Sequence, residues 1–159
     1  MNDSDPQTPM PEPRPIFYGA YERAVDGKGR FNLPFRFQRV GTEAGVEKYI
    51  ASEGPDTLLT VFPYGEWRRM FERLKGQSTT PERRAMVRRL SSGTHTLEPD
   101  RQGRVVLPPE VLGRAGIAGR VVVVGMGHYM ELWDPERFRR AQEAPPAPDP
   151  DFINGFYQE

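Results

Sequence analysis

The sequence predicts a mixed, mainly β fold of the α+β class, built from two fused halves of similar structure. A motif Asp-x-x-Gly-Arg-apolar-x-Leu-Pro starts at Asp26 and returns at Asp100, 74 positions later, and Gly19 and Gly93 match at the same offset. In the first motif, apolar and polar side chains alternate, which is the periodicity of a β-strand. A unit of this size buries too little apolar surface to be stable alone. We therefore expect the two copies to supply each other's missing strands around a pseudo-two-fold axis.

The first half is predicted to begin with a strand over 18–25, a tight turn and a second strand. Asp26 can hydrogen-bond the backbone that follows it, and Gly29 can adopt a positive φ, so both residue types favour a turn. Pro34 ends the second strand and opens a short helix over 35–39.

A loop over 41–48 is expected next, followed by a hairpin. Its strands are predicted at 49–52 and 58–62, joined by the turn residues 53–56. A helix over 64–75 then places four apolar side chains at the i, i+3, i+4 and i+7 positions of one face. These are Trp67, Met70, Phe71 and Leu74.

A linking helix joins the halves, and the second half repeats the first in compact form. Thr80 as N-cap and Pro81 in the first position predict that this helix runs to about Leu90. Asp134 is the expected cap of the last helix. The elements between them are a short helix at 109–115, a strand at 120–124, a turn at 125–128 and a strand at 129–133.

Composition divides the chain into five segments. We expect a disordered Pro-rich extension at 1–15, a first half at 16–75, a linking helix at 76–92, a second half at 93–142 and a Pro-rich acidic tail with an aromatic end at 143–159. The aromatic end is either a disordered terminus or a docking peptide for a partner or for the body's own surface.

The formal net charge of zero hides an uneven distribution. Of 22 basic and 22 acidic side chains, one basic and three acidic lie in residues 1–16, and four acidic lie in residues 141–159. The body therefore keeps 21 basic against 15 acidic groups. A basic body suits an anionic partner such as nucleic acid, although an ordinary solvated surface fits the same count. The acidic tail could compete with DNA for this body, in which case deleting 141–159 would tighten DNA binding.

Several classes of protein are not supported by the sequence. No run of about 18 apolar residues exists for a membrane span. The chain has no Cys and only two His residues, so we expect no disulfide, no metal site and no cofactor. Neither a Gly-rich phosphate loop nor a hydrolase signature is present, and we expect no enzyme activity.

The repeated turns hold the candidate functional residues. Asp26 and Asp100 are expected to brace the turns, and Gly29 and Gly103 to supply their backbone conformation. The following residues, Arg30 and Arg104, either contact a phosphate or base, or form a local ion pair with the aspartate. A carboxylate dyad made of the two aspartates is a further alternative; it would require a raised carboxyl pKa in a closed cleft.

The sequence resembles the MraZ family, whose halves are similar to AbrB-type swapped-hairpin DNA-binding domains. The residues that carry the resemblance occur in both halves. They are Phe17-x-Gly19, Asp26-x-x-Gly29-Arg30 with Leu33-Pro34, Pro63-x-x-Glu66-Trp67, Gly93-x-His95, Asp100-x-x-Gly103-Arg104 with Leu107-Pro108, Val123-Val124-Gly125 and Glu131-Leu132-Trp133-Asp134.

This resemblance implies two swapped-hairpin halves in one double-hairpin, barrel-like domain. It also implies a transcriptional regulator that binds short direct repeats upstream of the division and cell-wall gene cluster as a ring-shaped homo-oligomer, octamer or dodecamer, in the cytoplasm on the nucleoid. DNA contacts would come from Arg30 and Arg104, with Lys28 as an auxiliary phosphate contact and Gln102 in its place in the second half. The alternative is a ring-forming scaffold for protein partners with incidental DNA binding.

Overall fold

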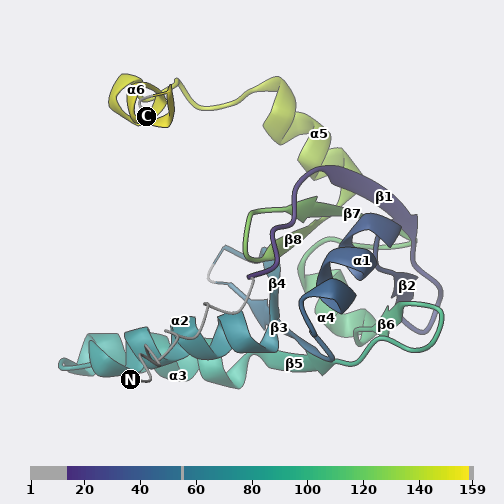
Figure 1. Ribbon diagram of the computed structural model, residues 1–159, viewed down its shortest axis with the longest axis horizontal. Helices are drawn as coiled ribbons and strands as arrows, with labels where there is room; N and C mark the ends of the chain where they lie inside the picture. Colours follow the sequence, from purple (N-terminus) through teal and green to yellow (C-terminus); the bar gives the residue numbers. More distant parts are fainter. Residues whose placement is uncertain (1–13, 55, 158–159) are drawn as a thin grey trace, which may run out of the picture.

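An antiparallel sheet of six strands forms the centre of the fold, and helices lie around it (Figure 1). The computed structural model describes residues 14–54 and 56–157. The strands are β1 Ala20–Ala24, β2 Arg30–Asn32, β3 Tyr49–Glu53, β4 Leu59–Pro63, β5 Thr94–Leu97, β6 Arg104–Val106, β7 Arg120–Gly125 and β8 Met130–Trp133. The helices are α1 Phe35–Glu43, α2 Tyr64–Gly76, α3 Pro81–Ser92, α4 Pro109–Arg114, α5 Pro135–Glu143 and α6 Pro150–Tyr157.

Each half contributes its first strand to the part of the sheet that the other half builds. The strand order is β1-β7-β8-β4-β3-β5, so β1 pairs with β7 and β5 pairs with β3. The strands β2 and β6 pair only with each other in a two-stranded ribbon, with Phe31 opposite Val105. At the sheet centre β4 pairs with β8, with Thr60 opposite Glu131. Because repeat-equivalent strands occupy mirrored places in the order, the arrangement has pseudo-two-fold symmetry.

The predicted mixed fold with a mostly antiparallel sheet is therefore confirmed, and the topology is consistent with two fused halves. The described strands do not close into a barrel. The sheet keeps two edges, β1 and β5, because β2 and β6 pair with each other and do not bridge these edges.

The main core lies between the sheet and the segments that contain α1, α4 and the ribbon. Phe37 of α1 meets Phe17 and Tyr21 edge-on, with ring centroids 5.4 Å apart in both pairs. Leu33 and Leu107, which follow the two ribbon strands, are both fully buried. Each such side chain contributes about 1.5–3 kcal/mol through burial, so the repeated Leu-Pro positions are core residues in both halves.

Helix α1 is longer than the sequence predicted. We expected it to end at residue 39 and a loop to follow from Gly41, yet the helix continues to Glu43 with Gly41 buried inside it. A Cβ at this position would overlap the hydroxyl oxygen of Tyr49. The glycine therefore serves close packing of α1 on β3, and it does not break the helix.

The predicted caps of the later helices are confirmed. Thr80 Oγ1 accepts a hydrogen bond of 3.1 Å from the Arg83 amide at the start of α3. Asp134 Oδ2 accepts one of 3.0 Å from the Arg137 amide at the start of α5. Each cap satisfies an amide that has no partner inside its helix and is typically worth about 1 kcal/mol.

The helices α2 and α3 pack on each other and extend away from the sheet (Figure 1). Trp67 and Phe71, on the predicted apolar face of α2, stack with ring centroids 4.8 Å apart. No helix in the described part of the chain has the length and hydropathy of a membrane span.

The ends of the chain differ from each other. Most of the predicted N-terminal extension, residues 1–13, lies outside the described residues, whereas Pro15 is buried against the body. At the other end, residues 150–157 form α6, which stands apart from the sheet at the end of an extended spacer (Figure 1).

Candidate nucleic-acid interface

The first repeated turn is held together by the side chain of Asp26. Its Oδ1 accepts hydrogen bonds from the amides of Lys28 and Arg30, both 2.9 Å long. Its Oδ2 accepts a bond of 2.7 Å from Nε of the Arg30 guanidinium. The Gly29 amide closes the turn onto the Asp26 carbonyl at 3.0 Å, with a φ of 83° at the glycine. One carboxylate thus fixes both the turn and the arginine that leaves it.

The second turn repeats this geometry bond for bond. Asp100 Oδ1 accepts from the amides of Gln102 and Arg104 at 2.8 and 3.0 Å, and Oδ2 accepts from Arg104 Nε at 2.8 Å. Gly103 has a φ of 76° and closes the turn at 2.9 Å. In both turns the exposed fraction is 42% for the arginine side chain and 43% for the aspartate. The two turns are therefore equivalent and both lie at the surface.

The ribbon of β2 and β6 brings both arginines to one surface. Phe31 and Val105 face each other and are buried, so their neighbours on both strands point to the opposite, outer side. Arg30 lies opposite Val106, and Arg104 lies opposite Asn32. These four residues form the outer face of the ribbon: Arg30, Asn32, Arg104 and Val106.

The arginines are oriented but keep free donors. Only Nε of each guanidinium is hydrogen-bonded to a described residue, which leaves the Nη atoms without a partner among the described residues. An arginine held in this way has two parallel donors for a phosphate or for the O6 and N7 atoms of guanine. Pre-orientation reduces the side-chain entropy that such a contact costs.

The two aspartates remain ionised across the physiological pH range. Hydrogen bonds from the Arg30 backbone and guanidinium lower the pKa of Asp26 from 3.8 to about 2. The corresponding bonds from Arg104 lower the pKa of Asp100. Each Asp–Arg pair thus carries almost no net charge, although the arginine donors stay available.

The alternative hypothesis of a catalytic dyad made of Asp26 and Asp100 is wrong. It required a raised carboxyl pKa in a closed cleft, whereas both carboxyl pKa values are lowered and both side chains are exposed. Each carboxylate is paired with its own arginine. Among the described residues, no group of three or more His, Asp or Glu side chains could hold a metal ion.

Lys28 and Gln102 occupy equivalent places beside the two arginines. Both side chains are exposed in the turns, one residue before Gly29 and Gly103 respectively. Lys28 adds a positive charge to the first turn, and the exposed Arg101, at the place of Gly27, adds one to the second turn. The candidate surface is therefore nearly symmetric in shape and in net charge, but the extra cation stands at a different position in each turn.

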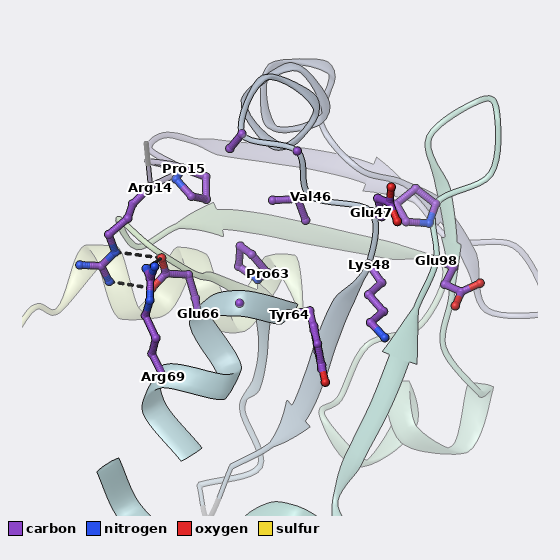
Figure 2. Close-up of a pocket in the computed structure, with 14 residues that line it drawn as sticks. Arg14, Pro15, Val46, Glu47, Lys48, Pro63, Tyr64, Glu66, Arg69 and Glu98 are labelled. Atoms are coloured by element: carbon purple, nitrogen blue, oxygen red, sulfur yellow. Dashed lines mark hydrogen bonds and ion pairs between the residues drawn. The ribbon is translucent and has the colours of Figure 1, made fainter. Parts of the chain in front are cut away.

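Two further polar clusters lie away from the ribbon and connect elements. At the start of α2, Glu66 is 7% exposed and accepts bonds from Arg14 at 2.6 and 2.9 Å and from Arg69 at 3.0 Å (Figure 2). Arg14, ahead of the first strand, thereby fixes the start of the described chain to α2. These residues line a groove of about 660 Å³, in which Glu66 is already neutralised by two arginines and Glu47 and Glu98 are the other carboxylates.

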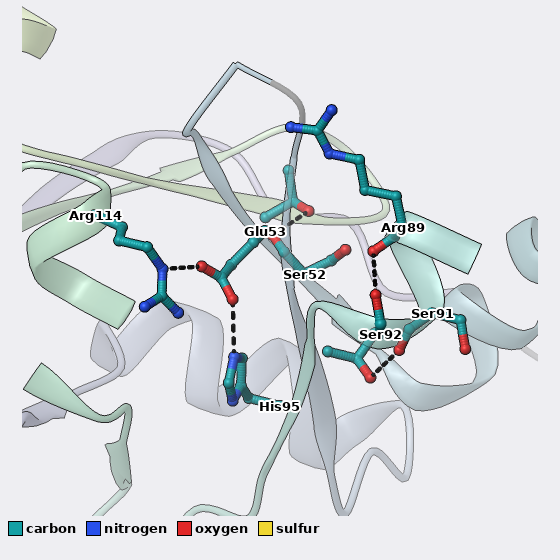
Figure 3. A network of polar contacts seen from close by, with 9 residues as sticks. Ser52, Glu53, Arg89, Ser91, Ser92, His95 and Arg114 are labelled. Atoms are coloured by element: carbon teal, nitrogen blue, oxygen red, sulfur yellow. Dashed lines mark hydrogen bonds and ion pairs between the residues drawn. The ribbon is translucent and has the colours of Figure 1, made fainter. Parts of the chain in front are cut away.

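The second cluster joins β3, β5 and α4. Glu53 accepts a bond of 2.8 Å from Arg114 Nε, and its other oxygen lies 3.2 Å from His95 Nε2 (Figure 3). The bond from Arg114, followed by the one from His95, lowers the pKa of Glu53. His95 is thus part of a contact between the halves.

Sequence reasoning identified the residues of the ribbon face only in part. The repeat pointed to the two Asp-x-x-Gly-Arg turns, and the alternation in the first motif put Arg30 and Asn32 on one side. It did not predict that β2 pairs with β6, which adds Val106 and joins the two turns. The signal was present in the repeat, because Phe31 and Val105 occupy equivalent positions. The Arg14–Glu66 contact had no such signal.

Comparisons with known proteins agree on one family. The family model described as "MraZ protein, putative antitoxin-like" matches residues 16–89 and again 90–146. A protein of Thermomicrobium roseum named "Transcriptional regulator MraZ" is 35% identical over 129 residues, which cover 80% of this chain and 88% of the relative. The proteins of the same name from Heliobacterium modesticaldum and Desulfitobacterium hafniense are 36% and 40% identical, over 80% and 74% of this chain and 87% and 80% of the relatives. With the model matching both halves and the relatives matching most of the chain, this protein belongs to the MraZ family.

Proposed function

We propose that the protein is a DNA-binding transcriptional regulator that contacts DNA through the outer face of the β2–β6 ribbon. One observation carries this proposal. Two equivalent arginines, each aligned by its own aspartate, present free Nη donors on a single exposed face. The names of the relatives, which are transcriptional regulators, support the same conclusion.

The charges of the turns suggest different tasks for the arginines and for Lys28. Because Asp26 and Asp100 neutralise them, Arg30 and Arg104 gain less than an isolated cation from the release of counterions around phosphates. Their aligned donors suit guanine, where a bidentate contact contributes about 1–3 kcal/mol of discrimination. Lys28 has no such carboxylate partner in the described chain and suits a phosphate. In this scheme the arginines supply specificity and Lys28 supplies affinity.

The targets and the assembly follow the family expectation. We infer that the sites are short direct repeats upstream of the division and cell-wall gene cluster, and that the protein acts as a ring-shaped homo-oligomer on the nucleoid. A ring would bind several repeats at once. The effective concentration of linked sites would then convert weak single contacts into a tight complex.

A gel-shift titration at several salt concentrations tests the proposal, with DNA from upstream of the protein's own gene and a shuffled DNA of equal length. Arg30→Ala should weaken binding to the upstream DNA by about 5–150-fold, the equivalent of 1–3 kcal/mol, with little effect on shuffled DNA. Lys28→Ala should weaken binding to both DNAs alike and reduce the salt slope by about 0.9. Arg84→Ala, which removes an exposed charge from α3, is the matched control.

The same variants separate binding from folding. The surface pair of Arg30 and Asp26 contributes about 0–1 kcal/mol, so the melting temperature of Arg30→Ala should stay close to that of the parent. An equal loss of stability would identify Arg30 as a structural residue. If the parent itself is not retained on DNA at low salt while its assembly is intact, the protein is a scaffold for protein partners.

A further inference from the structure

We propose that helix α6 is a docking arm that binds in a groove on the outer face of the sheet of a second copy of this chain. The inference concerns a segment beyond the family match, which ends at residue 146, and it does not depend on DNA binding.

The arm itself exposes apolar side chains. Phe152 is 74% exposed and Ile153 is 40% exposed, and both lie in a helix of eight residues. Isolated helices shorter than about 12–15 residues are marginal in water, and most helical stability comes from packing of an apolar face. A helix of this length therefore needs a surface against which these side chains can pack.

A suitable groove lies between the outer face of the sheet and the helices α2 and α3. Its volume is about 530 Å³, which falls within the 300–1,000 Å³ typical of binding sites. Phe62 of β4 and Tyr129 stack in its floor with ring centroids 4.8 Å apart. Met70, Leu90 and Met126 also line it. Methionine side chains adapt to aromatic ligands and make favourable contacts with their rings.

The acidic arm and the basic helices that border the groove have opposite charges. Residues 141–159 contain four acidic and no basic side chains, whereas residues 64–92, which form α2 and α3, contain eight basic and three acidic ones. Arg73 of α2 lies at the groove beside the acidic lining residues Asp56, Glu66 and Glu131, and Asp151 lies in the first turn of α6. Attraction to Arg73 and to the basic helices would orient the arm with Asp151 toward α2, and repulsion by the three carboxylates would disfavour other placements of Asp151.

The spacer favours a groove on another molecule. Residues 144–149 include Pro145, Pro146 and Pro148, and Pro150 starts α6. Such a segment adopts a stiff, extended conformation with a rise of about 3.1 Å per residue. Figure 1 shows it leading away from the sheet, with α6 at its far end. A stiff spacer opposes a sharp return to the chain's own groove and instead presents α6 to a neighbour.

Cysteine cross-linking of the full-length protein tests this inference, because the natural chain has no Cys. An Ile153→Cys chain is mixed with a Met70→Cys chain of different tag length and treated with a short bismaleimide. The cross-linked heterodimer should form in at least about tenfold higher yield than with a Met86→Cys chain. Met86 is the matched control, because it is an exposed methionine on α3 that does not line the groove. Met126, which is 43% exposed at the groove, provides a second position for the cross-link. The Met126→Cys chain keeps the test decisive if the Met70→Cys chain misfolds.

A charge exchange then tests the direction of docking. Arg73→Glu in the groove chain should reduce the cross-link about fivefold, and Asp151→Arg in the arm chain should restore it. Equal yields at Met70, Met126 and Met86 overturn the proposal. So does a cross-link that forms only within a single chain carrying both Ile153→Cys and Met70→Cys, because the arm would then occupy its own groove.

Discussion

Asp26 and Asp100 each combine three tasks in one side chain. One oxygen holds two amides of the turn, the other holds the arginine, and the negative charge balances the guanidinium. This explains why an acidic residue is compatible with a surface proposed to meet DNA. The carboxylate repels phosphate, but its arginine neutralises that charge and keeps free donors toward the ligand.

Gly29 is the position in the first turn where a side chain is least tolerated. Its φ is 83°, and an added Cβ would overlap the carbonyl oxygen of Leu107. This glycine also accepts the hydrogen bond of the Leu107 amide through its own carbonyl, at 3.0 Å. A side chain here would therefore disturb the connection between the two halves.

We predict that Gly29→Ala lowers the free energy of unfolding by about 2–4 kcal/mol, the sum of backbone strain and a clash with main chain. Gly27→Ala in the same turn is the control, because it has open space around its Cβ and should change stability by less than about 0.5 kcal/mol. Urea unfolding followed by circular dichroism measures both. Similar values for the two variants would contradict this role of Gly29.

At the scale of elements, the hairpins and caps were predictable and the pairing between halves was less so. Helix α2 and the caps at Thr80 and Asp134 follow from local signals, namely apolar spacing and a side chain that accepts from the backbone. The extent of α1 was missed because Gly41 is a loop signal in sequence, and only contact with Tyr49 reveals it as a packing residue. The ribbon register depends on contacts between residues 72 to 76 positions apart, about which local periodicity carries no information.

Helix α2 also carries the buried carboxylate of Glu66, whose ionisation contributes to stability. The hydrogen bond from Arg14 lowers the pKa of Glu66, although burial acts in the opposite direction. A group with a lowered folded-state pKa stabilises the protein above its unfolded-state pKa, which is about 4.5 here. This stabilisation disappears as the pH falls through the folded-state pKa.

We therefore predict that Glu66→Gln is less stable than the parent by about 1 kcal/mol at pH 7 and that the difference shrinks progressively as the pH falls below 4.5. Urea midpoints measured from pH 3 to pH 8 will report the difference. Glu72→Gln, an exposed change in the same helix, is the matched control and should change stability by less than about 0.5 kcal/mol at pH 7. A gap between parent and Glu66→Gln that persists at pH 3 would mean that the size and polarity of the side chain matter there and its charge does not.

At the scale of the whole molecule, the exchange of strands makes the halves interdependent. Among the described strands, β1 belongs to the first half but pairs only with β7 of the second, and β5 belongs to the second but pairs only with β3 of the first. The ribbon adds a third connection, β2 with β6. Each half taken alone would expose unpaired strand edges and the apolar side chains that the other half covers.

The two fragments 14–92 and 93–146 should consequently be unfolded as monomers and should fold when mixed. The mixture should show the β-sheet circular dichroism of the intact chain and a cooperative transition, since association restores all three inter-half pairings. Because the halves are alike, a fragment could also pair with a second copy of itself at high concentration, so each is measured over a range of concentrations. A monomeric fragment that unfolds cooperatively would contradict the interdependence. It would mean that the duplication joined two stable domains, in which case the two arginine turns would not be held in one fixed arrangement by the ribbon.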